Sequence, residues 1–313
     1  MDDVSHVPVI FLVFNRPELT SRVFAQIRGA KPAKLFVVAD GPRLGRPGEL
    51  EKCQAVRQIV ERGVDWPCKL VLDYSETNMG CGRRIYSGIT NAFTQVEEAI
   101  ILEDDCLPDP TFFRFCAELL DRYRNEPRVS VISGDNFQGA GWSCGHSYYF
   151  SRYPHCWGWA TWRRAWQAYD FEMKDWSAGR DRRQWLKEIT GSFVEARFWH
   201  KNFEAIRKSE IDTWDHQWTY ACWKNRCVSV LPARNLVENL GFGADASHTT
   251  GAAKPGNGPA SGMPFPLLHP EEIIPDRAAD RHTFDHHHKP SSFFRRLFVR
   301  VLRILKKDDS DAV

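Results

Sequence analysis

Three consecutive carboxylates, Glu103, Asp104 and Asp105, follow a short apolar run of the sequence. Such a run, bounded by turn residues, is typical of a strand buried on both faces of a sheet. The acids repel one another, and no Lys or Arg lies between Arg84 and Arg114 to offset them. Either water or a cation must therefore screen them, and hard oxygen ligands at a strand end suit Mg²⁺ or Mn²⁺. A solvated acidic loop is the alternative, although such loops seldom continue directly from a buried strand.

A sheet is needed to position these acids, and the N-terminal half of the chain has the pattern of one. Apolar runs alternate with helix-like segments, the runs lying at 7–14, 35–39, 70–72 and 99–102 and the helical segments at 17–28, 48–62, 83–96 and 111–124. This alternation predicts parallel βαβ units with helices on both faces of the sheet. Ligands of such sheets bind at the carboxyl ends of the strands, where we expect the acids.

The composition excludes several classes of protein. A chain of 313 residues with 42% hydrophobic residues can form one large or two modest soluble domains. Its net charge of +2 gives no overall attraction to nucleic acid, so no nucleic-acid partner is expected. The nine Cys include no C-x-x-C pair, so their pattern is not that of a disulfide framework. We therefore expect the protein in a reducing cytosol. No apolar run approaches the roughly 20 residues of a membrane-spanning helix.

Three motifs together resemble a known family. They are the first strand ending in Asn15-Arg16-Pro17, the string from Tyr74 to Arg84, and the triple acid continued by Pro-Asp-Pro-Thr-Phe-Phe. This set is similar to GT-A nucleotide-sugar glycosyltransferases, closest to the N-acetylglucosaminyltransferase I family and its bacterial family-2-like relatives. The resemblance covers residues 7–250. It implies an α/β fold of the GT-A type, a Rossmann-like mixed sheet flanked by helices.

The resemblance implies a donor site around the acids. Asp105 would bind Mn²⁺ or Mg²⁺, and Asp104 would face the ribose or the donor sugar. Glu103 would belong to the same donor-binding site. A divalent cation there would offset the charge of the leaving diphosphate as the glycosidic bond breaks. His248 lies in a string that resembles the family's closing loop, and its implied role is metal ligand or phosphate donor. A lone surface histidine is the alternative.

A pocket for uracil and its ribose is implied at the neighbouring strand ends, from Asn15, Arg16 and Asp40. A carboxylate at a strand end can accept a hydrogen bond from a ribose hydroxyl or a base N–H. Asn78 and Gly80 lie in a loop that allows the backbone to approach a nucleotide closely. For Arg16, a surface salt bridge is the alternative.

The segment from Tyr153 to Ala160 resembles the one that cradles the transferred sugar. Trp157 and Trp159 could stack on a pyranose, and Gly158 would permit close approach. Core packing is the alternative for either tryptophan.

Asp215 occupies the place of the family's catalytic base, which takes the proton from an acceptor hydroxyl in an inverting displacement. Asp212 is its rival, and a helix N-cap is the alternative role for either acid.

We expect a GT-A domain at 1–280 and a separate tail at 281–313. Within the domain, 1–135 would be the nucleotide-binding half and 136–250 the acceptor and sugar half, with a helical insertion at 175–208. Seven Lys or Arg and no acid lie between Lys289 and Lys307, with apolar residues on the opposite side of a helical wheel. This pattern predicts a basic amphipathic helix on an anionic membrane surface, with docking onto the protein's own core as the alternative.

The expected function is a metal-dependent inverting glycosyltransferase, a hexosyltransferase or N-acetylhexosaminyltransferase. It would move a sugar from a UDP-sugar to a glycan or lipid-linked acceptor, in the cytoplasm and peripheral to the inner face of the plasma membrane. The alternative from another class is a non-catalytic, membrane-associated carbohydrate-binding protein, which would not need the acids. A nucleotidyltransferase normally carries a Gly-rich basic loop after its first strand, and Asn15-Arg16-Pro17-Glu18 is not such a loop.

Overall fold

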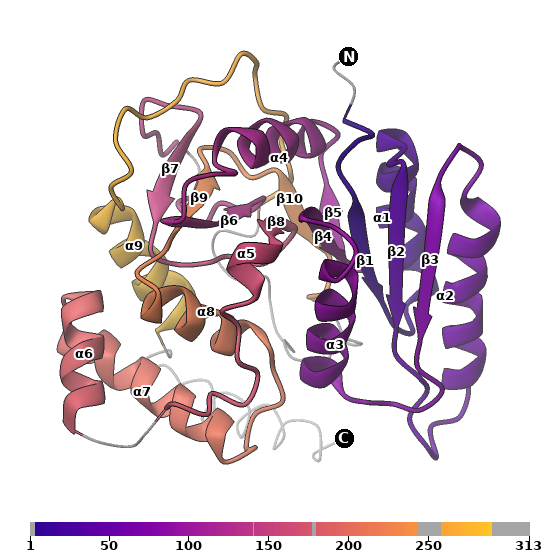
Figure 1. The fold of residues 1–313 in the computed structure, drawn as a ribbon, viewed down its shortest axis with the longest axis horizontal. Helices are drawn as coiled ribbons and strands as arrows, with labels where there is room; N and C mark the ends of the chain where they lie inside the picture. Colours follow the sequence, from indigo (N-terminus) through magenta and orange to yellow (C-terminus); the bar gives the residue numbers. More distant parts are fainter. Residues whose placement is uncertain (1–3, 140, 177–179, 243–257, 290–313) are drawn as a thin grey trace, which may run out of the picture.

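The computed structural model describes residues 4–139, 141–176, 180–242 and 258–289. Within these residues one mixed sheet of eight strands runs through both halves of the chain, in the order β3-β2-β1-β4-β8-β6-β9-β7 (Figure 1). Its strands are β1 (Val9–Val13), β2 (Lys34–Ala39), β3 (Lys69–Tyr74), β4 (Glu98–Glu103), β6 (Val129–Ser133), β7 (Tyr148–Ser151), β8 (Trp159–Trp162) and β9 (Val228–Pro232). The expected class, an α/β mixed sheet flanked by helices, is confirmed.

The first four strands are parallel and follow the predicted βαβ pattern. They are joined by α1 (Pro17–Ala30), α2 (Glu49–Gly63) and α3 (Cys81–Phe93). Val13 pairs with Ala39, and Leu12 pairs with Glu103. The carboxyl ends of β1, β2 and β4 therefore meet at one edge of the sheet.

The second half of the sheet begins with a reversal of direction. β8 is antiparallel to both β4 and β6, and Trp159 pairs with Ile101 on one side and with Ser133 on the other. The amino end of β8 thus lies at the same edge as the carboxyl ends of β4 and β6. The segment that precedes β8, with Trp157 and Gly158, is brought next to the acids in this way.

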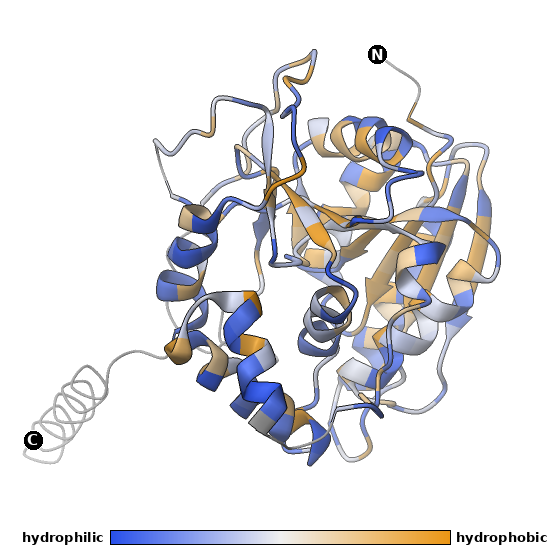
Figure 2. Ribbon diagram, turned by 60° about the vertical axis from the view of Figure 1, so that its left-hand side comes forward, coloured by the Kyte–Doolittle hydropathy of each residue, from blue (hydrophilic) through white to orange (hydrophobic). Residues whose placement is uncertain are grey.

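Helices cover both faces of the sheet, and the residues of β1, β2 and β4 are therefore mostly buried on both faces. Side chains of β1 and β2 at alternate positions pack against α1, α2 and α4 (Thr111–Arg122) on one face. The intervening positions pack against α3, α5 (Arg163–Trp166) and α8 (Asp215–Lys224) on the other. Figure 2 shows the strands mostly in hydrophobic colours, with many hydrophilic residues on the surrounding helices.

A third apolar cluster lies beside the sheet and includes two helices between residues 180 and 207. It joins α6 (Arg180–Thr190) and α7 (Phe193–Arg207) to Tyr153, Trp223 and Phe284. α9 (Arg277–Thr283) and the π-helical turn η1 (Phe284–His288) pack here, with Phe284 only 4% exposed. The expected boundary between residues 280 and 281 therefore falls inside α9, and residues 290–313 of the expected tail lie outside the described residues. None of the described helices is long and apolar enough to span a membrane.

Candidate active site

The three acids lie where β4 ends. Glu103 is the last residue of β4, and Asp104 and Asp105 form the turn into β5 (Cys106–Pro108). Burial raises the pKa of Glu103 well above its usual range, and the charges of Asp105 and Asp104 raise it further. Burial and the charge of Asp105 likewise raise the pKa of Asp104. The site therefore favours a ligand that brings positive charge to these oxygens.

Arg16 supplies part of that charge from a distant position in the sequence. Its guanidinium donates to Asp105 Oδ2 at 2.6 Å and to Asp104 Oδ1 at 3.4 Å. The contact forms because Arg16 follows β1, and β1 is the neighbour of β4 in the sheet. The expectation that no basic residue offsets the acids is therefore wrong. The resemblance had implied that Arg16 lines a pocket for uracil and its ribose. In the structure its guanidinium pairs with Asp104 and Asp105 instead.

A short two-stranded sheet brings further backbone to Asp105. β10 (Val237–Asn239) pairs antiparallel with β5, and the Leu240 N–H then donates to the Asp105 carbonyl at 2.7 Å. A Cβ built on Gly241 would lie 2.3 Å from Asp105 Oδ2, so this approach requires glycine. The predicted closing loop starts at this position. His248, its candidate ligand, lies outside the described residues.

The donor chemistry at Asp105 fits a divalent cation that a diphosphate also ligates. No three His, Cys, Asp or Glu side chains among the described residues are arranged to hold a metal ion by themselves. Mg²⁺, however, is commonly bound by one or two carboxylates together with substrate phosphates and water. Asp105 Oδ1 has only the Cys106 thiol, at 3.5 Å, as a partner in the described part of the chain. Glu103 has no hydrogen bond or ion pair there.

The two candidate bases lie at the start of α8, and the structure gives them different partners. The Asp212 carboxylate accepts from the Gly82 N–H at 3.0 Å, at the N-terminus of α3, where the helix dipole favours an anion. Asp215 is the first residue of α8, and the Thr213 hydroxyl donates to its carboxylate. Asp212 is thus engaged in capping α3, whereas the Thr213 hydroxyl is the only partner of the Asp215 carboxylate among the described residues.

Asp215 lies close enough to the acids to influence them. Its charge is one of the causes that raise the pKa of Glu103, after burial and the two neighbouring acids. Burial raises the pKa of the Cys156 thiol, and the charges of Asp215 and Glu103 raise it further. The sequence-distant ends of β4, β8 and α8 therefore form one acidic site.

Asp40 and Asn78 bind each other. The Asn78 amide donates to Asp40 Oδ2 at 3.0 Å and to the Gly41 carbonyl at 2.9 Å, and the Met79 N–H donates to Asp40 Oδ1 at 2.9 Å. Burial raises the pKa of Asp40 despite these donors. Gly80 follows with a φ of 83° and begins α3. Asp40 and Asn78 thus shape the loop at this edge of the sheet.

Asn15 belongs to a network that the sequence did not reveal. Its amide donates to Glu49 Oε1 at 3.0 Å, and the Arg43 backbone N–H donates to Glu49 Oε2 at 2.6 Å. The Arg43 guanidinium is the largest cause of the lowered pKa of Glu49. The sequence indicated only that Glu49 lies near the start of a helix. Its contact with Asn15 could not be predicted, because the fold brings these two distant residues together.

The two candidate sugar-stacking tryptophans differ in exposure. Trp159 is 1% exposed and stacks on Trp214 with ring centroids 5.5 Å apart, so it packs in the core and offers no face to a sugar. That expectation is therefore corrected. Trp157 is partly exposed and contacts Phe137 and Phe242 edge-to-face. Gly158 has a φ of 64°, and its Cβ would meet a Val237 methyl at 2.7 Å, so only glycine fits between β8 and β10.

A buried acid–histidine pair lies beside Trp157. His155 Nδ1 lies 2.9 Å from Asp135 Oδ1, and both side chains are almost fully buried. His155 Nε2 and Asp135 Oδ2 have no hydrogen-bond partner among the described residues. The His155 ring stacks on Phe137 at 4.2 Å. The sequence placed His155 in the sugar-cradling segment but gave no reason to pair it with Asp135.

Comparisons with known proteins show distant structural similarity only. No family model matches the chain, and no curated protein matches it in sequence. A mannosyltransferase from Pyrobaculum calidifontis in complex with GDP-Man and Mn²⁺ is 15% identical with a TM-score of 0.38, over 69% of this chain and 73% of that one. A UDP-glucose pyrophosphorylase complexed with UDP-glucose is 9% identical with a TM-score of 0.38, over 72% of this chain and 90% of that one. A UTP-bound UGPase from Acinetobacter baumannii is 8% identical with a TM-score of 0.39, over 75% of this chain and 88% of that one.

These structures include both a glycosyltransferase and nucleotidyltransferases, and all three TM-scores lie below 0.5.

Proposed function

We propose that the protein is a metal-dependent inverting glycosyltransferase that uses a UDP-sugar. The observation that carries this proposal is the acidic site itself, in which Asp105, Glu103 and Asp215 gather at one edge of the sheet. A carbohydrate-binding protein has no need for a buried carboxylate such as that of Glu103, whose pKa burial raises, since burying such a group costs stability.

In this proposal Asp105 holds the cation, and Glu103 and Asp104 face the ribose or donor sugar. When bound, the divalent cation would offset the charge of the leaving diphosphate. Arg16 keeps the Asp104 and Asp105 carboxylates oriented through its two contacts. Its fixed positive charge remains at the site while the diphosphate departs.

Asp215 is the base that we propose for the acceptor. It would take the hydroxyl proton while the acceptor oxygen bonds to the anomeric carbon and the bond from that carbon to the diphosphate breaks. Attack from the face opposite the leaving group inverts the anomeric configuration. The engagement of Asp212 with the start of α3 supports this choice.

The sugar and acceptor would occupy the aromatic side of the site. Trp157 is the stacking residue that we propose, because it is the partly exposed member of the pair. In this proposal the transferred unit is a hexose or an N-acetylhexosamine, and it goes to a glycan or to a lipid-linked acceptor. The basic pattern of 290–313 supports a peripheral position on an anionic membrane.

Release of UDP tests the proposed function directly. The protein is mixed with Mn²⁺ or Mg²⁺ and a panel of UDP-sugars, and free UDP is measured with and without chelator. Metal-dependent release from one donor supports the proposal. Sugar binding without release under any metal condition would favour the carbohydrate-binding alternative.

A further inference from the structure

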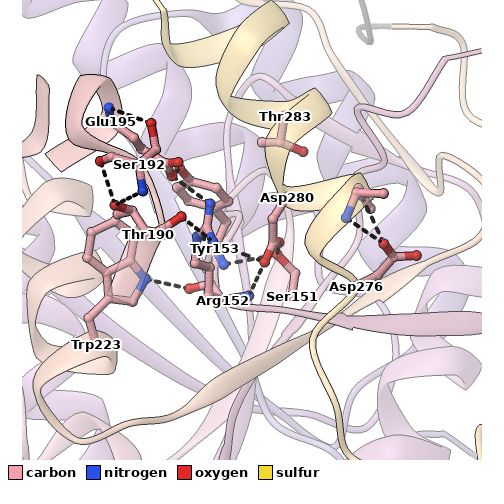
Figure 3. A network of polar contacts seen from close by, with 12 residues as sticks. Ser151, Arg152, Tyr153, Thr190, Ser192, Glu195, Trp223, Asp276, Asp280 and Thr283 are labelled. Atoms are coloured by element: carbon pink, nitrogen blue, oxygen red, sulfur yellow. Dashed lines mark hydrogen bonds and ion pairs between the residues drawn. The ribbon is translucent and has the colours of Figure 1, made fainter. Parts of the chain in front are cut away.

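A cavity of about 380 Å³ lies between the α6–α7 turn and the C-terminal segment formed by α9 and η1. Its polar wall is already organised, as Figure 3 shows. Arg152 donates to Glu195 at 2.7 Å and to the Thr190 carbonyl at 3.2 Å, and it also lies beside buried Asp280. Two acids thus balance the charge of Arg152, which leaves it a structural part of the wall.

Two other arginines of the cavity are not balanced. Arg277 and Arg281 are one turn apart on α9 and therefore share a face of the helix. Neither guanidinium has a hydrogen bond or an ion pair within the described residues. Lys289 is paired with Asp285, and Glu188 accepts from Gln184. Glu188 keeps its negative charge because Gln184 is neutral, and Arg277 and Arg281 are the two basic side chains of the lining that no described acid pairs.

Helix α7 also favours an anion. It begins at the cavity, with its N-cap Ser192 and its third residue Glu195 both in the lining. The positive end of the helix dipole therefore points toward the same space as the two arginines. A phosphate group suits this combination, because guanidinium forks bind phosphate oxygens in pairs.

Two exposed apolar side chains lie at the start of α7, beside the cavity. Phe193 and Val194, the first two residues of α7, are 71% and 60% exposed, and Val194 lines the cavity together with Ile189 and Phe284. Large apolar side chains exposed beside an anion-binding space suit an amphiphile and not a free inorganic ion.

Contacts of η1 connect the cavity to the aromatic residues beside the acidic site. Phe284 and Asp285 of η1 line the cavity, whereas His287 of the same turn stacks on Phe137 at 3.8 Å and contacts Trp157 edge-to-face. Trp157 in turn contacts Phe242, which adjoins Gly241 at Asp105. The turn η1 therefore borders the cavity through Phe284 and Asp285 and the aromatic side of the acidic site through His287.

We propose that this cavity binds the phosphate of a lipid phosphate, with the apolar chain lying on Phe193 and Val194, and that this lipid carries the acceptor. The assignment as acceptor rests on the proposed glycosyltransferase function. Binding of the lipid phosphate is measured separately from catalysis.

The test uses the full chain and two kinds of vesicle with equal negative charge, supplied by polyprenyl phosphate or by phosphatidylglycerol. A basic tail responds to both, whereas the cavity should prefer the polyprenyl phosphate. Arg277→Ala/Arg281→Ala should remove this preference, because the affinity for polyprenyl phosphate vesicles should fall about tenfold for each phosphate contact that is lost. The matched control Arg22→Ala/Arg62→Ala removes two exposed arginines on α1 and α2 and should keep it.

Two results would overturn the site: no preference in the parent, or a preference that survives the Arg277/Arg281 change. Pyrophosphate that binds the parent as tightly as the lipid would overturn the lipid assignment, and Phe193→Ser/Val194→Ser should weaken lipid binding alone. Asp105→Asn should bind lipid like the parent. Lipid binding without UDP release from any donor would overturn the glycosyltransferase and leave this site standing.

Discussion

The Arg16 guanidinium lies 2.6 Å from the Asp105 carboxylate, although the two residues are 89 positions apart in the sequence. Its second contact, with Asp104, is longer at 3.4 Å. One guanidinium therefore faces two carboxylates, and the adjacent Glu103 has no basic partner of its own among the described residues. This imbalance makes the stability of the site depend on pH and on cations.

The first prediction concerns the pH dependence of stability. The pKa of Asp104 is raised in the folded chain, whereas that of an aspartate in an unfolded chain is about 3.9. Between these two values the folded state holds a proton that the unfolded state has lost, so the free energy of unfolding should fall as pH rises. Above the folded pKa the loss should be complete. Asp104→Asn should make the decline shallower in urea unfolding measured from pH 4.5 to 8.

Mn²⁺ should counteract this decline because it binds the deprotonated carboxylates. Its stabilising effect should be larger at pH 8 than at pH 5. Asp121→Asn, at an exposed position on α4, is the control for removal of one charge. An unchanged slope in Asp104→Asn would show that other groups cause the decline.

The second prediction concerns the metal ligand. Asp105→Asn should abolish metal-dependent UDP binding and UDP release, because the amide cannot supply the negative charge that the cation needs. The fold should persist, since β4 is held by apolar packing on both faces. Calorimetry with UDP and Mn²⁺ measures this. Binding as tight as that of the parent would exclude Asp105 as the ligand.

The sequence predicted the strand ends of this site well because each depends on a local pattern. The apolar run before Glu103 and the alternation of strands and helices indicated where the acids would lie. The partners of the acids could not be predicted in this way. Arg16 reaches the acids because β1 and β4 are neighbours in the sheet. The order of the strands in a sheet cannot be predicted from the residues of one segment.

Trp157 and Trp159 show a second limit of the sequence. Both stand in one short aromatic string, but Trp159 begins β8 and turns into the core, whereas Trp157 precedes the strand. His287 is a third case, because its contacts with Phe137 and Trp157 depend on how the C-terminal segment packs. No spacing rule connects positions so far apart.

The third prediction separates the two candidate bases. Asp215→Asn should lower kcat by about 10²–10⁴ with little change in donor affinity, because a general base acts mainly in the transition state. Asp212→Asn should instead weaken the start of α3, with a loss of about 1 kcal/mol of unfolding free energy. Turnover and urea unfolding of both variants decide the matter. The reverse pattern would transfer the catalytic role to Asp212.

The fourth prediction uses the two tryptophans as a matched pair. Trp159→Ala should lower the unfolding free energy by about 3–5 kcal/mol, because it empties a fully buried site. Trp157→Ala should cost less stability and should raise KM for the sugar donor or acceptor, since its ring is partly exposed beside the site. Thermal unfolding and steady-state kinetics give both values. Unchanged kinetics in Trp157→Ala would remove it from the sugar site.

The last prediction concerns the C-terminal segment, where the structure refines the choice of truncation. A chain that ends at Pro290 keeps Phe284 in its buried position and His287 against Phe137, so it should fold and release UDP like the full chain. It should lose much of its attachment to anionic vesicles, because the basic residues from Arg295 to Lys307 are gone.

The attachment of the full chain should weaken as salt is added, since charges are screened beyond about 10 Å at 0.1 M ionic strength. A chain that ends at residue 280 is the contrasting variant, because it cuts α9 and removes Phe284 from the third apolar cluster. Its free energy of unfolding should be lower than that of the full chain both with and without vesicles. Vesicle sedimentation combined with thermal unfolding distinguishes the two effects, and equal sedimentation of the full chain and the chain ending at Pro290 would mean that residues 291–313 do not bind the membrane.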